Sequence, residues 1–429
     1  MKVLITPWGN PFEWKETTYV CNDFERVSVC TLPIIKEKVE PDVIIIIVLD
    51  TLANYTKNNP IPQRDFSKYD EVEEDVRERV NYFIENKLRY DPKDMELVIA
   101  PGVGVFNNVR VEGNLLDFYH YVVFKLAELL PTEDMTIYLD LTHGINFMPV
   151  LTYKAVTDLL SLASYTKNIR LVVLNSEPFP LGLPQEEVKK AKLKLRLVER
   201  NEVRPKQNLN VLRDKNYDKW NAFISSIANG FPLVFATFYP KIEEVKIEIE
   251  NRLKMFRDGI SVNGSTVVRE NELCLDFKIL SELYYLLRTL NTTFKDLPKQ
   301  EVELKELKRI SEILFNKLPR IGIVVEEQIK FLEDRLTTNG RPKRYVTMRA
   351  SSFVPLSELI QSGGLSGSDD GGRKVRNFIA HSGFEYNVTM VKVDNGGRLI
   401  FKYKSKGKVK SYAVESMRYR WVTEDEVPK

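Results

Sequence analysis

Short β-branched runs alternate with longer segments of helical periodicity along the first part of the chain, and this order constrains the fold more than any other feature. The apolar runs are residues 2–6, 43–49, 96–100, 136–141 and 170–174. Helix-period segments lie between them, at residues 65–88, 113–130 and 146–165, and residues 13–41 favour a hairpin before a short helix. Such alternation predicts βαβ units. We therefore expect residues 1–185 to form a Rossmann-like α/β domain, with a mainly parallel sheet covered by helices on both faces.

The loops that follow three of these strands are the candidate ligand site, because an open α/β sheet binds ligands outside the carboxyl ends of its strands. The loop after the fourth strand is the most specific, since it combines a hydroxyl, an imidazole, a glycine and a carboxamide. Two glycines alone also suit an ordinary tight turn, and the chain has neither a GxGxxG nor a GxxxxGK[ST] motif. The predicted ligand-binding residues are Trp8, Gly9, Asn10, Pro11, Thr142, His143, Gly144 and Asn146, with Gly102 and Gly104 as weaker candidates.

The second half of the chain has a different pattern. Residues 186–212 are basic and favour a helical linker, and residues 213–429 are expected to form an all-α domain. Apolar positions recur there at spacings of three and four, in segments 217–229, 241–257, 273–290, 302–318 and 324–336. Residues 386–393, 398–404 and 409–414 alternate instead, which predicts a small antiparallel β meander at about 385–415.

A short polar string follows a Gly/Ser/Asp-rich segment at residues 361–372, which we expect to be a mobile loop. On a helix, Asn377 and His381 share a face, and Arg376 can reach the same point. Gly383 predicts the end of this helix, so that His381 lies in the last turn, where the helix dipole favours its protonated form. An imidazole, a guanidinium and a carboxamide on one helical turn supply an acid or base, a cation and an orienting group. We therefore expect catalytic roles for His381, Arg376 and Asn377 respectively.

Composition narrows the remaining possibilities. The formal net charge is only +3, which excludes bulk charge as a reason to bind nucleic acid. No Asp/Glu/His cluster has metal-ligand spacing, so we expect a metal-independent enzyme without a cofactor. The 3 cysteines lack a CxxC pair and are expected to be reduced thiols. No apolar run can span a bilayer and no secretory signal is evident, so we expect a cytoplasmic protein. Glutamines are few and lysines are many, which favours a heat-adapted, archaeal source.

Three strings in the first half resemble the CARF sensor domain of type III CRISPR accessory ribonucleases. They are WGNP from Trp8, DTL from Asp50, and DLTHGIN from Asp140. The RNxxxH string from Arg376 resembles the HEPN nuclease motif. The two motifs in this order resemble the CARF–HEPN accessory ribonucleases, the Csx-one family.

This resemblance implies an activator, a substrate and an assembly. The activator would be a cyclic oligoadenylate, commonly cyclic tetra-adenylate, bound across a two-fold CARF dimer. The substrate would be single-stranded RNA, cut in antiviral defence to a 2′,3′-cyclic phosphate and a 5′-hydroxyl. The catalytic residues would come from two protomers of a homodimer or of a higher homo-oligomer of dimers.

Two alternatives remain open on the sequence alone. The first is a nucleotide-responsive CARF transcription regulator, in which the RNxxxH string is accidental and a helix reads DNA. The second is a HEPN toxin-type ribonuclease that is controlled by a protein partner.

Overall fold

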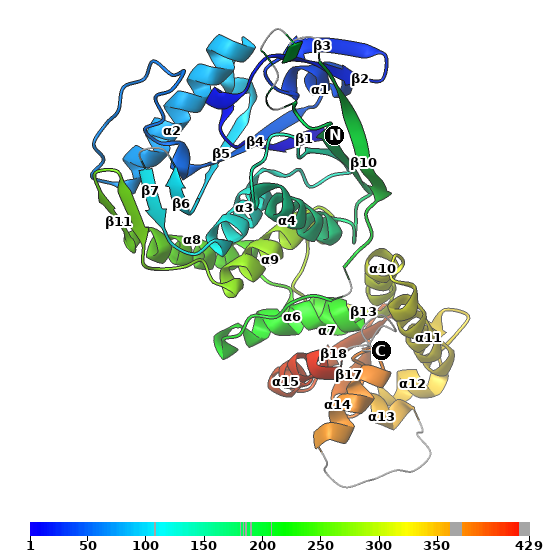
Figure 1. The fold of residues 1–429 in the computed structure, drawn as a ribbon. Coiled ribbons are helices and arrows are strands. Elements are labelled where there is room, and N and C mark those ends of the chain that lie inside the picture. Colours follow the sequence, from blue (N-terminus) through cyan, green and yellow to red (C-terminus); the bar gives the residue numbers. More distant parts are fainter. Residues whose placement is uncertain are drawn as a thin grey trace, which may run out of the picture. The chain divides into compact units, whose positions relative to one another are not determined.

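The computed structural model describes residues 1–106, 109–180, 182, 184, 187–188, 191–206, 208–360 and 371–419 (Figure 1). The chain divides into two compact units. The first unit combines Met1–Arg204 with Lys246–Thr289, and the second combines Pro205–Val245 with the chain from Leu290 onward. Each unit is therefore built from segments that are separated in the sequence.

The main sheet of the first unit contains eight strands among the described residues, in the order β3-β2-β10-β9-β8-β1-β4-β5. Every neighbouring pair is parallel except β2–β3 and β9–β10. The five predicted strands all form, so the expected mainly parallel sheet is confirmed. The strands are β1 (Lys2–Pro7), β2 (Thr17–Cys21), β3 (Phe24–Ser28), β4 (Val43–Leu49), β5 (Glu96–Ala100), β8 (Met135–Asp140), β9 (Ile169–Ser176) and β10 (Lys192–Glu202).

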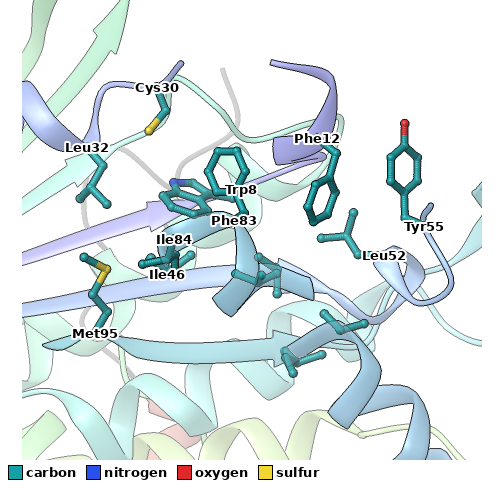
Figure 2. Close-up of a cluster of buried hydrophobic side chains, with 14 of the residues drawn as sticks. Trp8, Phe12, Cys30, Leu32, Ile46, Leu52, Tyr55, Phe83, Ile84 and Met95 are labelled. Carbon is teal, nitrogen blue, oxygen red and sulfur yellow. The ribbon is translucent and has the colours of Figure 1, made fainter. Parts of the chain in front are cut away.

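Helices cover both faces of this sheet, as predicted. In β4, Ile44, Ile46 and Val48 join a buried cluster with side chains of α1 (Leu32–Val39) and α2 (Tyr69–Phe83). Figure 2 shows part of this cluster around Trp8. The alternate β4 residues are also buried, because α3 and α4 pack on each other and against β5 and β1. These two helices are α3 (Leu116–Leu129) and α4 (Met148–Ala163).

A second sheet of the first unit joins distant parts of the chain. Its order is β11-β12-β7-β6, and β12 pairs with β7 in parallel. The segment Lys246–Thr289 thus belongs to the first unit, whereas the sequence places all of residues 213–429 in one helical domain. The elements are β6 (Gly104–Phe106), β7 (Val109–Glu112), α8 (Ile242–Asp258), β11 (Ile260–Asn263), β12 (Thr266–Arg269) and α9 (Leu275–Asn291).

A buried ionic network fixes this segment to the main sheet. The guanidinium of Arg269 lies 2.9 Å from Asp50 Oδ2 and 3.7 Å from Asp117 Oδ2, and all three side chains are buried. Arg269 also donates to the carbonyl of Gly102, whose N–H donates to Asp50 Oδ1 at 2.7 Å. Buried carboxylates need such partners, because desolvation destabilises an unpaired charge. Burial accordingly raises the pKa of Asp50, and the nearby Arg269 opposes that shift.

The predicted helical linker is wrong for its central part, where residues 192–202 form strand β10. Leu193 and Leu195 alternate with lysines, which is the period of a strand with one covered face. Leu193 packs into the core cluster, and β10 lies between β2, to which it is parallel, and β9, to which it is antiparallel. Helix propensity of the Lys/Arg residues was therefore outweighed by pairing with two strands.

The second unit is mainly helical, which confirms the predicted fold class of this half. Its helices are α6 (Asp218–Asn229), α7 (Pro232–Phe238), α10 (Leu304–Phe315), α11 (Pro319–Leu336), α12 (Arg344–Arg349), α13 (Leu356–Leu359), α14 (Gly371–Ala380) and α15 (Lys406–Ser416). An antiparallel sheet has the order β13-β18-β17-β16, and β14 pairs with β15. These strands are β13 (Val302–Glu303), β14 (Thr337–Thr338), β15 (Arg341–Pro342), β16 (Val354–Pro355), β17 (Thr389–Val393) and β18 (Leu399–Tyr403).

The predicted β meander is correct for its first two strands and wrong for the third. Strands β17 and β18 pair antiparallel, but the residues predicted as a third strand lie in helix α15. Ser405 caps this helix by accepting from the N–H of Lys408 at 3.5 Å. Val409 and Ala413 are buried at a spacing of four, so the helical period describes this segment better than the alternation did.

Three further expectations concern single features. Cys21, Cys30 and Cys274 are free thiols, as predicted. Within the described ranges, no helix has the length and apolar character needed to cross a bilayer. Residues 361–370, most of the predicted mobile loop, lie outside the described residues.

Candidate functional sites

The turn between β8 and α4 is organised around the buried carboxylate of Asp140. This carboxylate accepts from Thr31 Oγ1 at 2.5 Å, and from the N–H and Oγ1 of Thr142 at 3.1 and 2.5 Å. Burial raises the pKa of Asp140, and these hydroxyls oppose the shift. Thr142 Oγ1 in turn accepts from the N–H of Ser176 at the end of β9. The ends of β8 and β9 are thus held together by side chains at the carboxyl edge of the sheet.

His143 forms the wall of this edge. Its ring lies against Trp14, with the centroids 4.2 Å apart, and its Nε2 accepts from the N–H of Thr31 at 3.1 Å. Burial lowers the pKa of His143 to about 3, so the ring is neutral near pH 7. Because Nε2 is an acceptor, the ring proton is on Nδ1. His143 is therefore a fixed, uncharged polar group.

A cavity of about 550 Å³ opens beside these residues in the first unit. Its volume lies in the range of small-molecule sites, and its wall mixes aromatic rings with hydroxyl, amide and charged groups. Among the described residues, Lys15 is the one cation of the lining, which also has two carboxylates. The lining residues are Glu13, Trp14, Lys15, Tyr19, Val29, Thr142, His143, Asn175, Ser176, Glu177, Pro178, Phe179 and Leu193. Of the predicted ligand residues, this cavity brings together Thr142 and His143.

The predicted residues of the first loop lie behind the cavity rather than in its wall. Trp8 is fully buried within the cluster of Figure 2. It packs edge-on against Trp14, with the ring centroids 5.3 Å apart. Gly9 donates to the carbonyl of His143 at 2.8 Å. Asn10 and Pro11 are buried too, and Asn10 Oδ1 accepts from the N–H of Phe12. This loop packs against the turn that carries His143 and does not line the cavity. Its contact with ligand remains a prediction.

The remaining predicted glycines and Asn146 also lie outside the cavity lining. A Cβ atom on Gly144 would lie 2.8 Å from Pro149 Cγ, so glycine is needed where the turn meets α4. Asn146 is exposed and has a φ of 49°. Gly102 is buried in the Asp50 network, and Gly104 is exposed with a φ of 113°. Their binding roles likewise remain predictions.

Several residues that line the cavity were not among the predicted ligand-binding residues. Asn175 and Ser176 end strand β9, the neighbour of β8, and the rule that ligands sit at strand ends would have identified them. Trp14 and Tyr19 come from the turn and strand β2 of the N-terminal segment. No periodic signal connects them with Thr142, because the contact depends on the fold.

The second candidate site lies at the end of α14 in the second unit. Val375 and Phe378 bury one face of the helix, where Phe378 packs against Phe231 with ring centroids 5.0 Å apart. Arg376 and Asn377 lie on the exposed face. The N–H of His381 donates to the carbonyl of Asn377 at 3.1 Å, which continues the helical turn beyond Ala380. Asn377 and His381 therefore lie one helical turn apart, with Arg376 directly before Asn377, and the catalytic roles of the three residues remain predictions.

The end of this helix is fixed by its backbone. Ser382 and Gly383 have φ values of 48° and 82°, and the N–H of Gly383 donates to the carbonyl of Phe378 at 2.8 Å. A Cβ on Gly383 would lie 3.1 Å from Phe231 Cβ. The predicted helix stop at Gly383 is confirmed, and it lies two residues after His381.

His381 is half-buried between two side chains that the sequence did not reveal. Its Nδ1 lies 3.3 Å from Gln328 Oε1 and 3.3 Å from the Tyr386 hydroxyl, and the His381 and Tyr386 rings have centroids 4.5 Å apart. Burial lowers the pKa of His381, and Glu385 opposes this only in part. Burial thus shifts the pKa in the direction opposite to the predicted preference for the protonated form, which considered only the helix dipole. The neutral ring can act as a base near pH 7.

Among the residues that the structure describes, no group of three His, Cys, Asp or Glu side chains could hold a metal ion. The end of α14 presents the imidazole of His381, an exposed guanidinium and an exposed amide.

Both halves of the chain match families of known proteins. Residues 3–178 match the family described as CRISPR system endoribonuclease Csx1, CARF domain, and residues 318–405 match the family described as CRISPR system endoribonuclease Csx1, HEPN domain. The CRISPR system endoribonuclease Csx1 of Methanocaldococcus jannaschii is 28% identical over 451 residues, which cover 97% of this chain and 91% of that protein. The Enterococcus italicus Csm6 bound to cyclic hexa-2'-fluoro-hexa-dAMP is 13% identical over 98% of this chain and 93% of that chain, with a TM-score of 0.24.

An α/β unit that carries a CARF domain and a helical unit that carries a HEPN domain define the class of CARF–HEPN proteins. Within this class, the chain belongs to the Csx1 family.

Proposed function

We propose that this protein is an endoribonuclease of type III CRISPR antiviral defence, which cuts single-stranded RNA when a cyclic oligoadenylate binds to the first unit. The observation that carries the proposal is the arrangement at the end of α14. Arg376 and Asn377 are exposed one turn before a half-buried, neutral His381. A membership in the Csx1 family supports the same activity.

The chemistry follows from the groups on this turn. The neutral His381 takes the proton of an RNA 2′-hydroxyl, whose oxygen attacks the adjacent phosphorus. The bond from phosphorus to the 5′-oxygen then breaks, and this oxygen takes a proton and leaves as a hydroxyl. Arg376 stabilises the negative charge that develops on the phosphate oxygens, and Asn377 orients the phosphate. The products are a 2′,3′-cyclic phosphate and a 5′-hydroxyl, and no step requires a metal ion.

One such turn presents its groups from one side of the RNA only. We propose that two protomers related by a two-fold axis form a composite site, since an isologous interface brings the same surface of both copies together. One His381 then serves as the base, and the proton that its imidazole has taken is returned to the leaving oxygen.

The activator site is proposed at the cavity beside His143. Its 550 Å³ suits part of a large nucleotide ring, so a cyclic tetra-adenylate would span the cavities of two protomers. The half-buried Trp14 ring offers a surface for an adenine base, and Thr142, Asn175 and Ser176 offer hydrogen-bonding groups. We assign residues 1–185 to sensing and residues 213–429 to cleavage, with Lys246–Thr289 packed in the first unit.

The test is cleavage of a fluorescent single-stranded RNA in EDTA, with and without cyclic tetra-adenylate. We expect cleavage only with the nucleotide, and loss of at least about a hundredfold in rate for His381→Ala and Arg376→Ala, because each removes a group that acts in the transition state. Cleavage without nucleotide would favour the partner-controlled toxin instead. No cleavage in either condition, together with nucleotide-dependent DNA binding, would favour the transcription regulator.

Activator binding is measured separately by calorimetry on the same variants. Arg376→Ala is expected to bind cyclic tetra-adenylate as the wild type does, because its side chain is exposed on the second unit. A variant that loses both binding and cleavage would have lost its fold, and its cleavage result would not be counted.

A further inference from the structure

The imidazole of His381 is held along one edge by residues of two other segments. Gln328 reaches it from α11, and Tyr386 reaches it from the chain after α14. Both contacts go to Nδ1, at 3.3 Å each, and the Tyr386 ring covers the imidazole at an interplanar angle of 33°. Distances of this length are usual for a site without substrate, and they shorten when the reacting complex forms.

The chemistry of the two partners selects one form of the imidazole ring. The Gln328 Oε1 atom can only accept a hydrogen bond, so its bond to a neutral His381 forms in the tautomer that carries the hydrogen on Nδ1, whereas the Tyr386 hydroxyl can donate or accept. The lone pair of the ring is then on Nε2. Among the described residues, Nε2 of His381 makes no hydrogen bond, so it is the atom that can receive a proton from substrate.

Gln328 is a polar side chain in a buried position. It is 8% exposed, and its Nε2 has no hydrogen-bond partner within the described part of the chain. A buried amide with one unsatisfied end destabilises a fold, whereas a Met or Leu of similar volume would not. The amide is therefore best explained by its contact with the imidazole.

We propose that Gln328 and Tyr386 are positioning residues, which hold His381 in the Nδ1-protonated tautomer and direct Nε2 to the RNA 2′-hydroxyl. This inference rests on the proposed ribonuclease function. A fixed tautomer matters because the other tautomer would present an N–H to the nucleophile and could not take its proton.

Few ionisable groups surround this cluster. Burial lowers the pKa of His381, and Glu385 raises it. Burial raises the pKa of Tyr386, while Gln328 and Arg335 of α11 lower it. Glu385 is itself held by the N–H groups of Asn387 and Val388, at 3.0 and 2.9 Å. A change at Gln328 should therefore be the main new influence on the imidazole.

The first experiment reads the tautomer directly. Long-range ¹H–¹⁵N spectra of the full-length protein report which ring nitrogen carries hydrogen, and the chain has only 3 histidines, so His381→Ala identifies the relevant signals. We expect the Nδ1–H form in the wild type and a mixture of both forms in Gln328→Met. A wild type in the Nε2–H form would overturn the proposal.

The second experiment measures cleavage by positioning variants. Gln328→Met should lower kcat by about ten- to hundredfold, as loss of a supporting hydrogen bond to a functional histidine does, with KM for RNA unchanged. Tyr386→Phe should lower it less, because the ring contact remains. Gln300→Met, at an exposed glutamine of the same unit, is the control and should cleave as the wild type does.

Gln328→Glu separates positioning from simple packing. A carboxylate at this place still accepts from Nδ1 and raises the pKa of His381, so the acid limb of the pH–rate profile should move to higher pH. Activity should return above that limb, in contrast to Gln328→Met. An unshifted profile, or wild-type cleavage by both Gln328→Met and Tyr386→Phe, would overturn the proposal. If the wild type cuts no RNA, the ribonuclease assignment fails, whereas the tautomer spectrum still decides whether Gln328 fixes the ring.

Discussion

Replacing Arg269 with methionine tests how the middle of the chain is held in the first unit. The substitution keeps the length of the side chain and removes the cation between Asp50 and Asp117, whose carboxylates are buried. Removing one partner of a buried ion pair costs about 3–5 kcal/mol, because the remaining charge is left without compensation. For a domain of about 150–250 residues, each kcal/mol lowers the melting temperature by about 2–4 °C. We therefore expect the first unit of Arg269→Met to melt about 6–20 °C earlier.

The assay must separate the two units, since a chain with two domains does not unfold in one step. Hydrogen exchange of backbone amides in β7 and β12, followed by mass spectrometry against temperature, reports the first unit alone. Arg110→Met is the matched control, because its ion pair with Glu112 is exposed and contributes about 1 kcal/mol or less. Both arginines lie on neighbouring strands, β12 and β7.

The pH dependence of the loss checks its cause. Burial raises the pKa of Asp50 above its ordinary 3.8, so without Arg269 this carboxyl favours the protonated form in the folded state. A group with a raised pKa in the folded state stabilises the fold at low pH, and this stabilisation is lost as the pH rises through that pKa. The loss of unfolding free energy caused by Arg269→Met should therefore be smaller near pH 4 than at pH 7. A loss of less than about 1 kcal/mol at pH 7, equal to that of the exposed control, would refute the reasoning.

Three further predictions concern the two sites. Gly9→Ala places a Cβ 2.5 Å from Ile145 Cγ2, so it should destabilise the first unit by about 1–3 kcal/mol. It should also abolish the binding of cyclic tetra-adenylate measured by calorimetry, and normal binding would contradict this. Trp14→Ala uncovers His143, so NMR titration should show its pKa rising from about 3 toward 6.5, and activator affinity should fall by on the order of tenfold; an unchanged pKa would show that Trp14 does not desolvate the ring. Because burial lowers the pKa of His381 below 6.5 and the neutral ring is the base, the acid limb of kcat should lie below pH 6.5; a limb above this value would contradict that role.

The main sheet could be predicted from the sequence because its strands carry their burial in their own composition. Strand β4 is apolar at every position, and the structure buries six of its seven residues. Strand β10 was missed because its charged residues favour a helix locally, and its pairing with β2 depends on residues far away in the chain. The hairpin β11–β12 was also missed, although its two-residue turn, Gly264-Ser265, is a hairpin signal in the sequence.

The candidate sites divide in the same way. Arg376, Asn377 and His381 are close in sequence, so the period of one helix was enough to group them. Gln328 and Tyr386 join His381 only through tertiary packing, and nothing in their local sequence marks them. Trp8 was predicted to contact ligand because it precedes a turn, yet the sheet buries its ring completely. A strand-end rule identifies a loop, but it does not tell which side of that loop faces the cavity.

Because Lys246–Thr289 belongs to the first unit, a single cut in the chain cannot separate the two units. A fragment that stops after β10 would keep Asp50 and Asp117 but lack their arginine, and its strand β7 would have an open edge without β12. Such a truncation would expose an unpaired strand edge, which promotes aggregation. To produce the first unit alone, residues 246–289 would therefore have to be joined to residues 1–204 by an engineered linker. Otherwise the full-length chain must be expressed.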